Sequence, residues 1–154
     1  MNIGWEDFPV GRAITTPSVT VTESHVVQFA NLTGDWYPLH MDADWAGRTP
    51  FGKRIAHGPL IFSLGVGLMY QSQCFGHSIL AWLGADQIRA TAPVYFEDTL
   101  HVVATVTGSR ASKEPERGVV TLRYDIQKQT AESVLSYNFV LLMRSRECTA
   151  SKSE

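Results

Sequence analysis

The longest uncharged stretch of the chain, residues 55–85, is the feature that organises the rest of the sequence. Beyond Pro59 its apolar residues occupy every side of a helix, and Pro59 itself suits a first helical turn because its missing amide would have no partner there. A helix that is apolar all round is expected to be buried all round. Membrane insertion is the alternative, but Gly65, Gly67 and a polar end interrupt the run before the roughly 20 residues that a span needs. We predict a buried central helix, ending within residues 71–76, whose start is open to a ligand.

The pattern then changes from helical to alternating. Four strands are predicted, over residues 79–94 with a kink or bulge at Gly84, and over residues 99–107, 119–127 and 134–144, with a polar hairpin loop at 109–118. Successive alternating strands with short connections indicate an antiparallel meander. The inward-facing residues are expected to be Leu100, Val102, Ala104, Val106, Val120, Leu122, Tyr124, Ile126, Leu135, Tyr137, Phe139, Leu141 and Met143.

The segment before the central helix predicts smaller elements. Residues 5–16 are interpreted as an arm and residues 18–22 as a short strand or extended lead-in. Thr20 and Glu23 have the spacing of a capping box, in which Glu23 would accept a hydrogen bond from the Thr20 amide. A helix is expected to follow, with Val26, Phe29, Ala30 and Thr33 on one face, and to end near Gly34.

Residues 35–42 carry Asp, Trp, Tyr and His unusually densely for a loop. Pro38 disfavours helical dihedrals at Tyr37, so we expect this segment to be irregular and extended. Polar and aromatic residues on such a loop make it a better site candidate than a helix face. A turn of helix is expected over residues 44–49, followed by a loop to residue 54.

Length and composition limit the number of domains and the kinds of partner that are expected. The 154 residues suffice for one domain, residues 1–154, in which residues 147–154 form a polar tail. With 44% hydrophobic and 18% charged residues and a net charge of -2, the chain is globular, and nothing suggests nucleic acid or a membrane as partner. Cys74 and Cys148 lack the spacing of a metal site and are interpreted as reduced thiols. The first residues do not resemble a signal peptide, which favours a cytoplasmic location.

These elements together predict an α+β architecture, in which a curved antiparallel sheet wraps one long buried helix. The strand edges of such a sheet need covering. Pairing edge to edge with a second copy of the chain is one natural way to cover them, so a homodimer, or a higher oligomer built from dimers, is expected.

Three segments, taken in order, resemble the MaoC-like dehydratase or (R)-specific enoyl-CoA hydratase family of the hot-dog fold. They are residues 34–40 (GDWYPLH), 55–64 (IAHGPLIFSL) and 92–100 (APVYFEDTL). One position departs from the family's pattern, which usually has Asn where this chain has Tyr37. The departure leaves the fold and the catalytic pair intact but bears on the choice of acyl substrate.

The resemblance implies a hydro-lyase of fatty acid metabolism that acts on an acyl-CoA, or on an acyl group delivered by acyl carrier protein. It implies that Asp35 and His40 are the catalytic pair, that the Gly58 amide contacts the thioester oxygen, and that Ser63 supports the site. No metal and no cofactor beyond the coenzyme A of the substrate would be needed.

The chemistry of these residue types agrees with that implication. Hydration of a conjugated thioester needs a base for water, a proton for the α-carbon and a donor for the thioester oxygen. A carboxylate and an imidazole that grip one water can supply the first two. An unpaired amide at a helix N-terminus can supply the third, and Gly58 has no side chain to obstruct it.

Each candidate also has a purely structural interpretation. Asp35 could end the first helix and His40 could be a buried, hydrogen-bonded histidine, whereas His57 is expected to shape the turn into the central helix. Ser63 reaches the site only if that helix begins at Pro59. Other residues have two open roles: Trp36, Tyr37, Pro38, Trp45, Phe51 and Phe62 as acyl-binding or core residues, and Arg48, Lys53, Arg54 and Arg89 as phosphate-binding or solvated residues.

Two other functions remain alternatives. Thioester hydrolysis on the same fold would place water near the carbonyl and generally depends on a differently placed acid. A non-catalytic subunit, binding acyl thioesters within a heteromeric dehydratase, would have no need of both Asp35 and His40.

Overall fold

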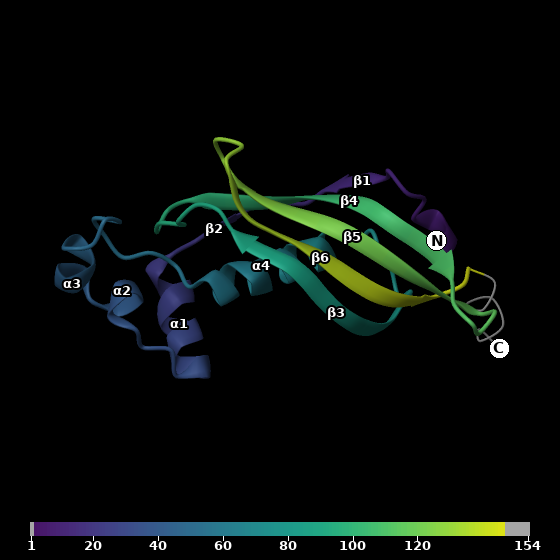
Figure 1. Ribbon diagram of the computed structural model, residues 1–154, viewed down its shortest axis with the longest axis horizontal. Coiled ribbons are helices and arrows are strands. Elements are labelled where there is room, and N and C mark those ends of the chain that lie inside the picture. Colours follow the sequence, from purple (N-terminus) through teal and green to yellow (C-terminus); the bar gives the residue numbers. More distant parts are fainter. Residues whose placement is uncertain (1, 147–154) are drawn as a thin grey trace.

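The computed structural model describes residues 2–146 of the chain. One 3₁₀ helix, η1 (Trp5–Asp7), is followed by the helices α1 (Glu23–Thr33), α2 (Pro38–Met41), α3 (Ala43–Gly47) and α4 (Gly58–Gln71). The strands are β1 (Ala13–Thr15), β2 (Val19–Thr20), β3 (Ile79–Ala90), β4 (Thr99–Ala111), β5 (Arg117–Lys128) and β6 (Ser133–Arg144). Helices α1 to α3 gather at one end of the sheet, and α4 runs from that end along one face of it (Figure 1).

The strands form one antiparallel sheet in the order β1-β4-β5-β6-β3, with β2 also paired to β4. The predicted meander is confirmed as β4-β5-β6, and β3, which precedes it in sequence, joins on the far side of β6. The arm predicted over residues 5–16 is more ordered than expected, because β1 pairs with β4. The helix lying on a curved sheet confirms the α+β class.

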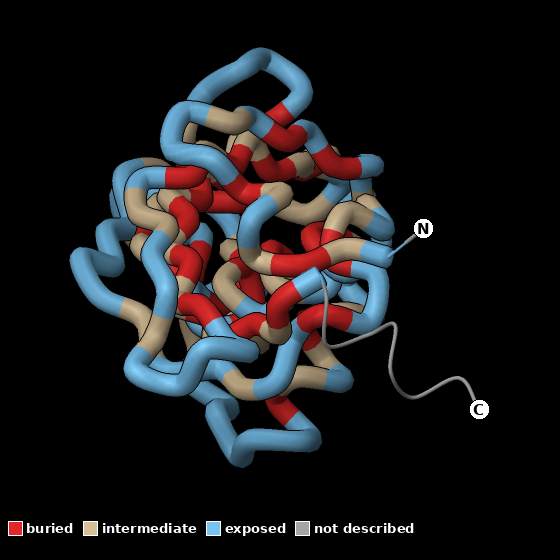
Figure 2. The backbone as a smooth tube through the Cα atoms, turned by 90° about the vertical axis from the view of Figure 1, so that its right-hand side faces the viewer, coloured by how far each residue is buried: buried red, intermediate tan, exposed pale blue. Residues whose placement is uncertain are grey.

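Alternation places one face of the sheet in the core. Burial alternates strictly along β5 and nearly so along β4 and β6, and the predicted inward residues are buried. In Figure 2 the buried backbone lies inside the sheet and helix layers, with exposed loops around it. The hairpin loop is shorter than predicted, since β4 and β5 extend to Ala111 and Arg117.

Helix α4 lies close against the sheet at Gly65. A Cβ atom added there would lie 2.6 Å from the Ile126 Cδ1 and 2.8 Å from the Tyr137 hydroxyl, far inside normal contact distance. The Tyr137 hydroxyl donates a hydrogen bond to the Phe62 carbonyl at 3.2 Å. A glycine is therefore required for this spacing of helix and sheet.

The expectation that α4 is buried all round is wrong for the single chain. Leu60, Ile61, Gly65, Leu68 and Met69 face the sheet and are buried, whereas Tyr70 is 67% exposed, and Ser63 and Gly67 are also exposed. The sheet covers one side of the helix only, so its apolar outer side is left uncovered by the described part of the chain. Within residues 2–146, no helix is both long and apolar enough to cross a membrane.

Strand β3 is irregular, as the sequence predicted. Its pairing with β6 shifts register three times, and one shift lies between Trp82 and Gly84. Gly84 has a φ of 152°, and Gln87, beside another shift, has a φ of 50°. These bulges bend β3 at the edge of the sheet that borders the start of α4.

The predicted capping box at α1 is wrong in its residues. The N-cap is Thr22, two residues later than expected, and His25 completes the box: its Nδ1 lies 3.0 Å from the Thr22 amide and 2.9 Å from the Thr22 hydroxyl. Thr20 instead belongs to β2, where its hydroxyl contacts that of Thr99 at 2.7 Å. Pairing of β2 with β4 removes Thr20 from the helix start. The helix ends at Gly34, as predicted.

The segment 35–42 is only partly extended. Tyr37 has a ψ of 134°, outside the helical region, as expected before a proline. Pro38, however, opens the one-turn helix α2 instead of excluding helix, because a proline is tolerated at the first helical position. The turn predicted over residues 44–49 corresponds to α3. Cys74 is a free thiol, and Cys148 and the rest of the predicted tail lie outside the described residues.

We predict that Gly65→Ala destabilises the fold. Its methyl group would clash with Ile126 and Tyr137, and overpacking of a core typically costs about 1–3 kcal/mol. Gly67→Ala is the matched control on the exposed side of α4, where nothing lies within 4 Å of an added Cβ. Equilibrium unfolding in urea measures both. Equal stability of the two variants would contradict the close-packing argument.

Candidate active site

The end of α1 places Asp35 at the edge of the site. Gly34 ends the helix with a φ of 78°, and its amide donates to the Ala30 carbonyl at 2.8 Å. Asp35 follows directly, with its side chain 45% exposed and its Oδ1 3.3 Å from the Tyr37 amide. The turn leaves the carboxylate accessible to a ligand.

His40 lies in α2 and is fixed by backbone contacts. Its Nδ1 lies 2.8 Å from the Ile55 carbonyl, which can only accept, so Nδ1 carries the proton and Nε2 is the acceptor in the neutral ring. Arg54 donates from Nε to the His40 carbonyl at 2.7 Å. The guanidinium of Arg54 also pairs with Glu23 and lies 4.9 Å above the Phe96 ring. His40 is therefore held with Nε2 free to take a proton.

Burial lowers the pKa of His40 below its ordinary value. The neighbouring His57 acts in the same direction, while the Ile55 carbonyl and the Asp35 carboxylate oppose the shift. The neutral ring, which can act as a base, is thereby favoured near neutral pH.

His57 is the residue before α4 and is completely buried. Its ring stacks on that of His40, with centroids 3.8 Å apart and planes 31° from parallel. Its Nε2 lies 3.0 Å from the Asp35 backbone carbonyl and 4.0 Å from the Asp35 Oδ2. The sequence had indicated only a turn-shaping role for His57, yet it lies against both members of the expected catalytic pair.

Asp35, His40 and His57 thus form one cluster, in which one side-chain nitrogen or oxygen from each residue lies within 4.8 Å of those of the other two. A separation of this size between Asp35 and His40 can be bridged by one water molecule.

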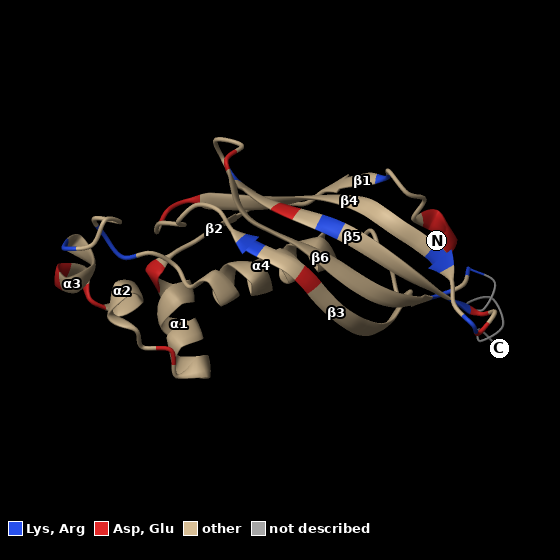
Figure 3. Ribbon diagram, viewed as in Figure 1, with Lys and Arg blue, Asp and Glu red and all other residues tan. Residues whose placement is uncertain are grey.

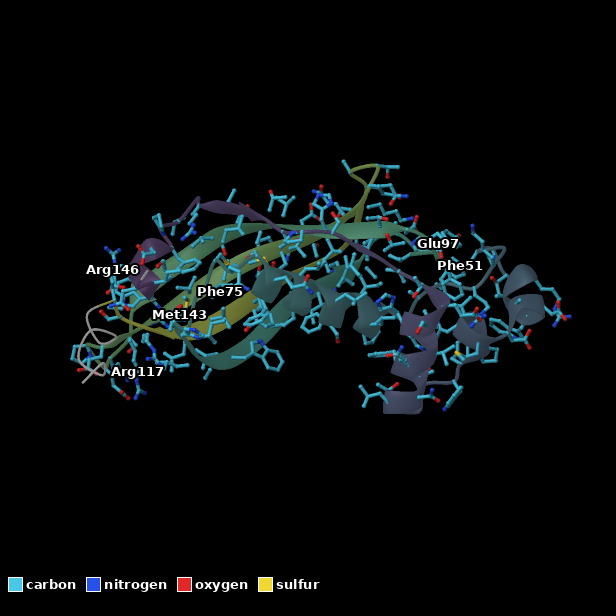
Figure 4. The ribbon with its side chains drawn as sticks, turned by 180° about the vertical axis from the view of Figure 1, so that it is seen from behind. Phe51, Phe75, Glu97, Arg117, Met143 and Arg146 are labelled. Atoms are coloured by element: carbon cyan, nitrogen blue, oxygen red, sulfur yellow. The ribbon has the colours of Figure 1, made fainter. Side chains whose placement is uncertain are left out.

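Gly58, the first residue of α4, lies where two cavities meet. The backbone amides of a first helical turn have no intrahelical acceptor, and nothing lies within 4 Å of a Cβ added at Gly58. One cavity, of about 300 Å³, is bounded by Phe51, Ile55 and Val94 among others. Figure 4 shows Phe51 beside Glu97 near the helical end of the molecule, far from Arg117 and Arg146 at the other end.

The second cavity, of about 700 Å³, runs between the start of α4 and strand β3. Its walls are apolar and include Pro59, Phe62, Trp82, Ile88 and Leu135. The Trp82 ring stacks on Phe139 at 5.7 Å, and its indole N–H donates to the Gly84 carbonyl at 2.8 Å. Sequence reasoning missed Trp82 and Ile88; the signal available was the apolar, kinked strand that follows the central helix.

The other expected site residues lie in three kinds of place: on the wall of the apolar cavity, on the protein surface, and within helices α2 and α4. Phe62 lines the apolar cavity, Pro38 begins α2, and Trp36 is 53% exposed. Tyr37, also 53% exposed, packs edge-on against His40 and Trp45. Helix α4 begins at Gly58, one residue before Pro59, which is early enough for Ser63 to reach the site. The Ser63 hydroxyl nevertheless donates to the Pro59 carbonyl at 2.9 Å, and Ser63 lines another cavity, of about 320 Å³.

The basic residues are spread around the site and form no single cluster with it. Arg54 is committed to His40 and Glu23, as described above. The Lys53 ammonium lies 4.6 Å above the Tyr95 ring. Figure 3 shows α4 without charge along its length, and charged residues scattered over the sheet, including β3 and β5, and over α1 to α3. Phosphate binding by Arg48, Lys53 or Arg89 remains a prediction.

Comparisons with known proteins agree on one family. The family model described as "MaoC like domain" matches residues 7–128 of the chain. Protein MaoC of Klebsiella aerogenes is 34% identical over 101 residues, covering 66% of this chain but only 30% of that protein. The (R)-specific enoyl-CoA hydratase of Rhodospirillum rubrum is 31% identical over 129 residues, covering 77% of each chain.

Solved structures agree on the fold. A structure titled monoamine oxidase regulatory protein, from Archaeoglobus fulgius, superimposes with a TM-score of 0.86 at 34% identity, covering 93% of this chain and 95% of that one. A Mycobacterium tuberculosis protein described as a double hotdogfold has a TM-score of 0.80 at 21% identity, covering 94% of this chain and 44% of that one. The predicted hot-dog fold is confirmed.

We predict that His40 titrates below its ordinary pKa of about 6.5. Because the folded state disfavours the protonated ring, the unfolded state binds more protons in this window, so stability falls as pH falls through it. NMR titration of the His40 ring in the folded protein, compared with the urea-unfolded chain, measures the shift. A folded midpoint at or above the unfolded one would contradict the argument.

Proposed function

The chain belongs to the MaoC-like domain family, and from that premise we propose that it is an acyl-CoA hydratase or dehydratase. The reaction is the reversible addition of water to a 2-enoyl thioester, giving a 3-hydroxyacyl thioester. The observation that carries the proposal is the gathering of Asp35 and His40 in one cluster, next to a helix start that opens on an apolar cavity, with the His40 Nδ1 already committed to the Ile55 carbonyl.

In the hydration direction, Asp35 and His40 hold one water between them. The His40 Nε2 takes a proton from this water while its oxygen bonds to the β-carbon, and negative charge develops on the thioester oxygen. The proton held on the His40 Nε2 then passes to the α-carbon, which restores the neutral ring and discharges the thioester oxygen. The amide of Gly58 donates to that oxygen, supported by the positive end of the α4 dipole. Dehydration uses the same groups in reverse.

The apolar cavity beside Gly58 fits an acyl chain, whose thioester would then lie at the start of α4. The acyl group is delivered as a coenzyme A thioester, or by acyl carrier protein. The hydratase name of the Rhodospirillum rubrum relative supports this substrate class, since its match covers 77% of both chains.

A substrate panel tests the proposal against its alternatives. Hydration of short, medium and branched 2-enoyl-CoAs is followed by loss of the absorbance of the conjugated thioester. Hydrolysis of the saturated thioesters is followed in parallel by release of free thiol. Hydration alone supports the proposal, whereas hydrolysis alone favours the thioesterase and neither reaction favours the non-catalytic subunit.

We predict that Asp35→Asn and His40→Ala each lower turnover by roughly 10²- to 10⁴-fold, the usual contribution of a positioned acid or base. The double variant should lose little more than the worse single variant, because the two groups act on one water. Steady-state kinetics with the best enoyl thioester measures all three.

Asp44→Asn, an exposed carboxylate on α3, is the matched control and should retain wild-type turnover. Circular dichroism confirms that each variant is folded. Near-wild-type rates in the folded single variants would show that the site is misassigned.

We predict that Tyr37→Asn changes relative activity among acyl groups and leaves measurable turnover. Tyr37 packs on His40 and Trp45 and is half exposed beside the site, so its loss alters the wall and not the proton-transfer groups. Turnover across the substrate panel measures the change. A uniform collapse on every substrate, with the fold intact, would make Tyr37 catalytic.

We also propose that the protein is a homodimer joined through β3. The strand ends the sheet, and its outer edge finds no strand partner among residues 2–146. Apolar side chains crowd this edge, among them Ile79, Leu80, Trp82, Leu83 and Ile88, all exposed by 40% or more. We predict a dimer in sedimentation at low micromolar concentration, weakened by Leu83→Lys, because a lysine on an edge strand opposes pairing. A stable, active monomer of the wild-type chain would contradict this.

A further inference from the structure

The proposed chemistry leaves His57 without a role. This ring is completely buried, so it cannot reach a substrate, and it nevertheless contacts both Asp35 and His40. A buried imidazole is costly unless its polar atoms are satisfied. Here one of them, Nδ1, has no hydrogen-bond partner within the described residues.

The contact with Asp35 fixes the tautomer of His57. Its Nε2 lies 3.0 Å from the Asp35 backbone carbonyl, which can only accept, so Nε2 carries the proton. With the proton on Nε2, the other ring nitrogen, Nδ1, carries a lone pair. The geometry therefore assigns the donated proton to Nε2 and leaves Nδ1, which faces no hydrogen-bond partner within the described residues, as the second ring nitrogen.

The same ring limits how His40 can move. Its centroid lies 3.8 Å from that of His40 on one side, and Phe29 lies 5.0 Å from His57. His40 is thus held at one edge by the Ile55 carbonyl and on one face by His57. The edge that carries Nε2 is left for the reaction.

We propose that His57 is a positioning residue of this site. Its Nε2–H holds the backbone that carries the Asp35 carboxylate, and its ring supports the face of His40, so that the two groups meet one water in one geometry. The inference rests on the proposed function for its catalytic meaning, while the tautomer and the contacts are independent of it.

Two variants separate the two contacts. His57→Phe keeps a flat ring against His40 and loses the hydrogen bond, whereas His57→Gln keeps an N–H donor at a similar reach and loses the ring. Each should lower kcat by roughly 10- to 100-fold with little change in KM, since misplacing reacting groups by about 1 Å can cost that much. His77→Phe, an exposed histidine beyond the other end of α4, is the control and should match wild type.

A double-variant cycle distinguishes positioning from general stability. If His57 acts through Asp35, then His57→Phe should cost less than about threefold in the Asp35→Asn background, because groups acting as a unit are strongly non-additive. A full additional loss in that background, or a rise in KM with unchanged kcat, would overturn the proposal. If the Phe variant fails to fold, the Gln variant supplies the same cycle.

NMR of the ¹⁵N-labelled imidazoles gives a readout that needs no activity, and the chain's five histidines are assigned by single substitutions. We expect a proton on the His57 Nε2, donated to the Asp35 carbonyl, and His57→Phe should shift the His40 resonances. The other tautomer, or unchanged His40 resonances, would overturn the proposal. A wild-type protein that turns over no enoyl thioester but shows the expected spectra would refute the proposed function alone.

Discussion

The close contact of α4 with the sheet at Gly65 is the constraint on which the rest of the structure depends. With no side chain there, the helix lies directly against Ile126 and Tyr137. Burial raises the pKa of the Tyr137 hydroxyl, so this group stays protonated and donates to the Phe62 carbonyl of the helix. A helix fixed along its length in this way also has a fixed beginning. That beginning carries His57 and Gly58 into the site.

Residues 54–57 transmit this constraint to the segment that carries Asp35 and His40. The Arg54 side chain binds the His40 carbonyl, and the Ile55 carbonyl accepts from the His40 ring. The Ala56 amide donates to the Val94 carbonyl at 2.8 Å, which ties the segment to the loop before β4. His57 completes the series at the Asp35 carbonyl. Three of these four consecutive residues thus hold Asp35 or His40, while Ala56 anchors the segment, and two of the four contacts use backbone atoms of residues 54–57.

Because some of these contacts are made by backbone atoms, only part of the site could be predicted from the sequence. The strands were predicted because alternation records which face of a sheet is buried, and Asp35, His40 and Gly58 were found through a motif with ordered spacing. The role of the Ile55 carbonyl could not be predicted, since every residue has a carbonyl and only the fold decides which one is used. The prediction of the α1 cap was wrong for a similar reason. Thr20 and Thr22 are the same residue type and lie close together in the sequence, and the pairing of β2 with β4 decides which of them caps the helix.

The error about α4 is informative in a different way. Its apolar outer side correctly indicates a surface that needs covering, but nothing in the helix says whether its own chain supplies the cover. The described chain covers only the side facing the sheet, and the bulged, apolar edge of β3 lies along the same open flank. Burial predicted from a pattern refers to the assembled protein, which can contain more than one copy of the chain.

Gly58 divides the site into two parts with opposite character. On one side lies the polar cluster of Asp35, His40 and His57, and on the other an apolar cavity bounded by Phe62 and Trp82. The cluster is held by residues 54–57, whereas the position of Trp82 is set by the β3 bulge and its stack on Phe139. Under the proposed function, the walls of the acyl cavity at β3 are therefore set by a different element from the groups that transfer protons. Changes in β3 can alter the acyl group that fits without moving the groups that hold water.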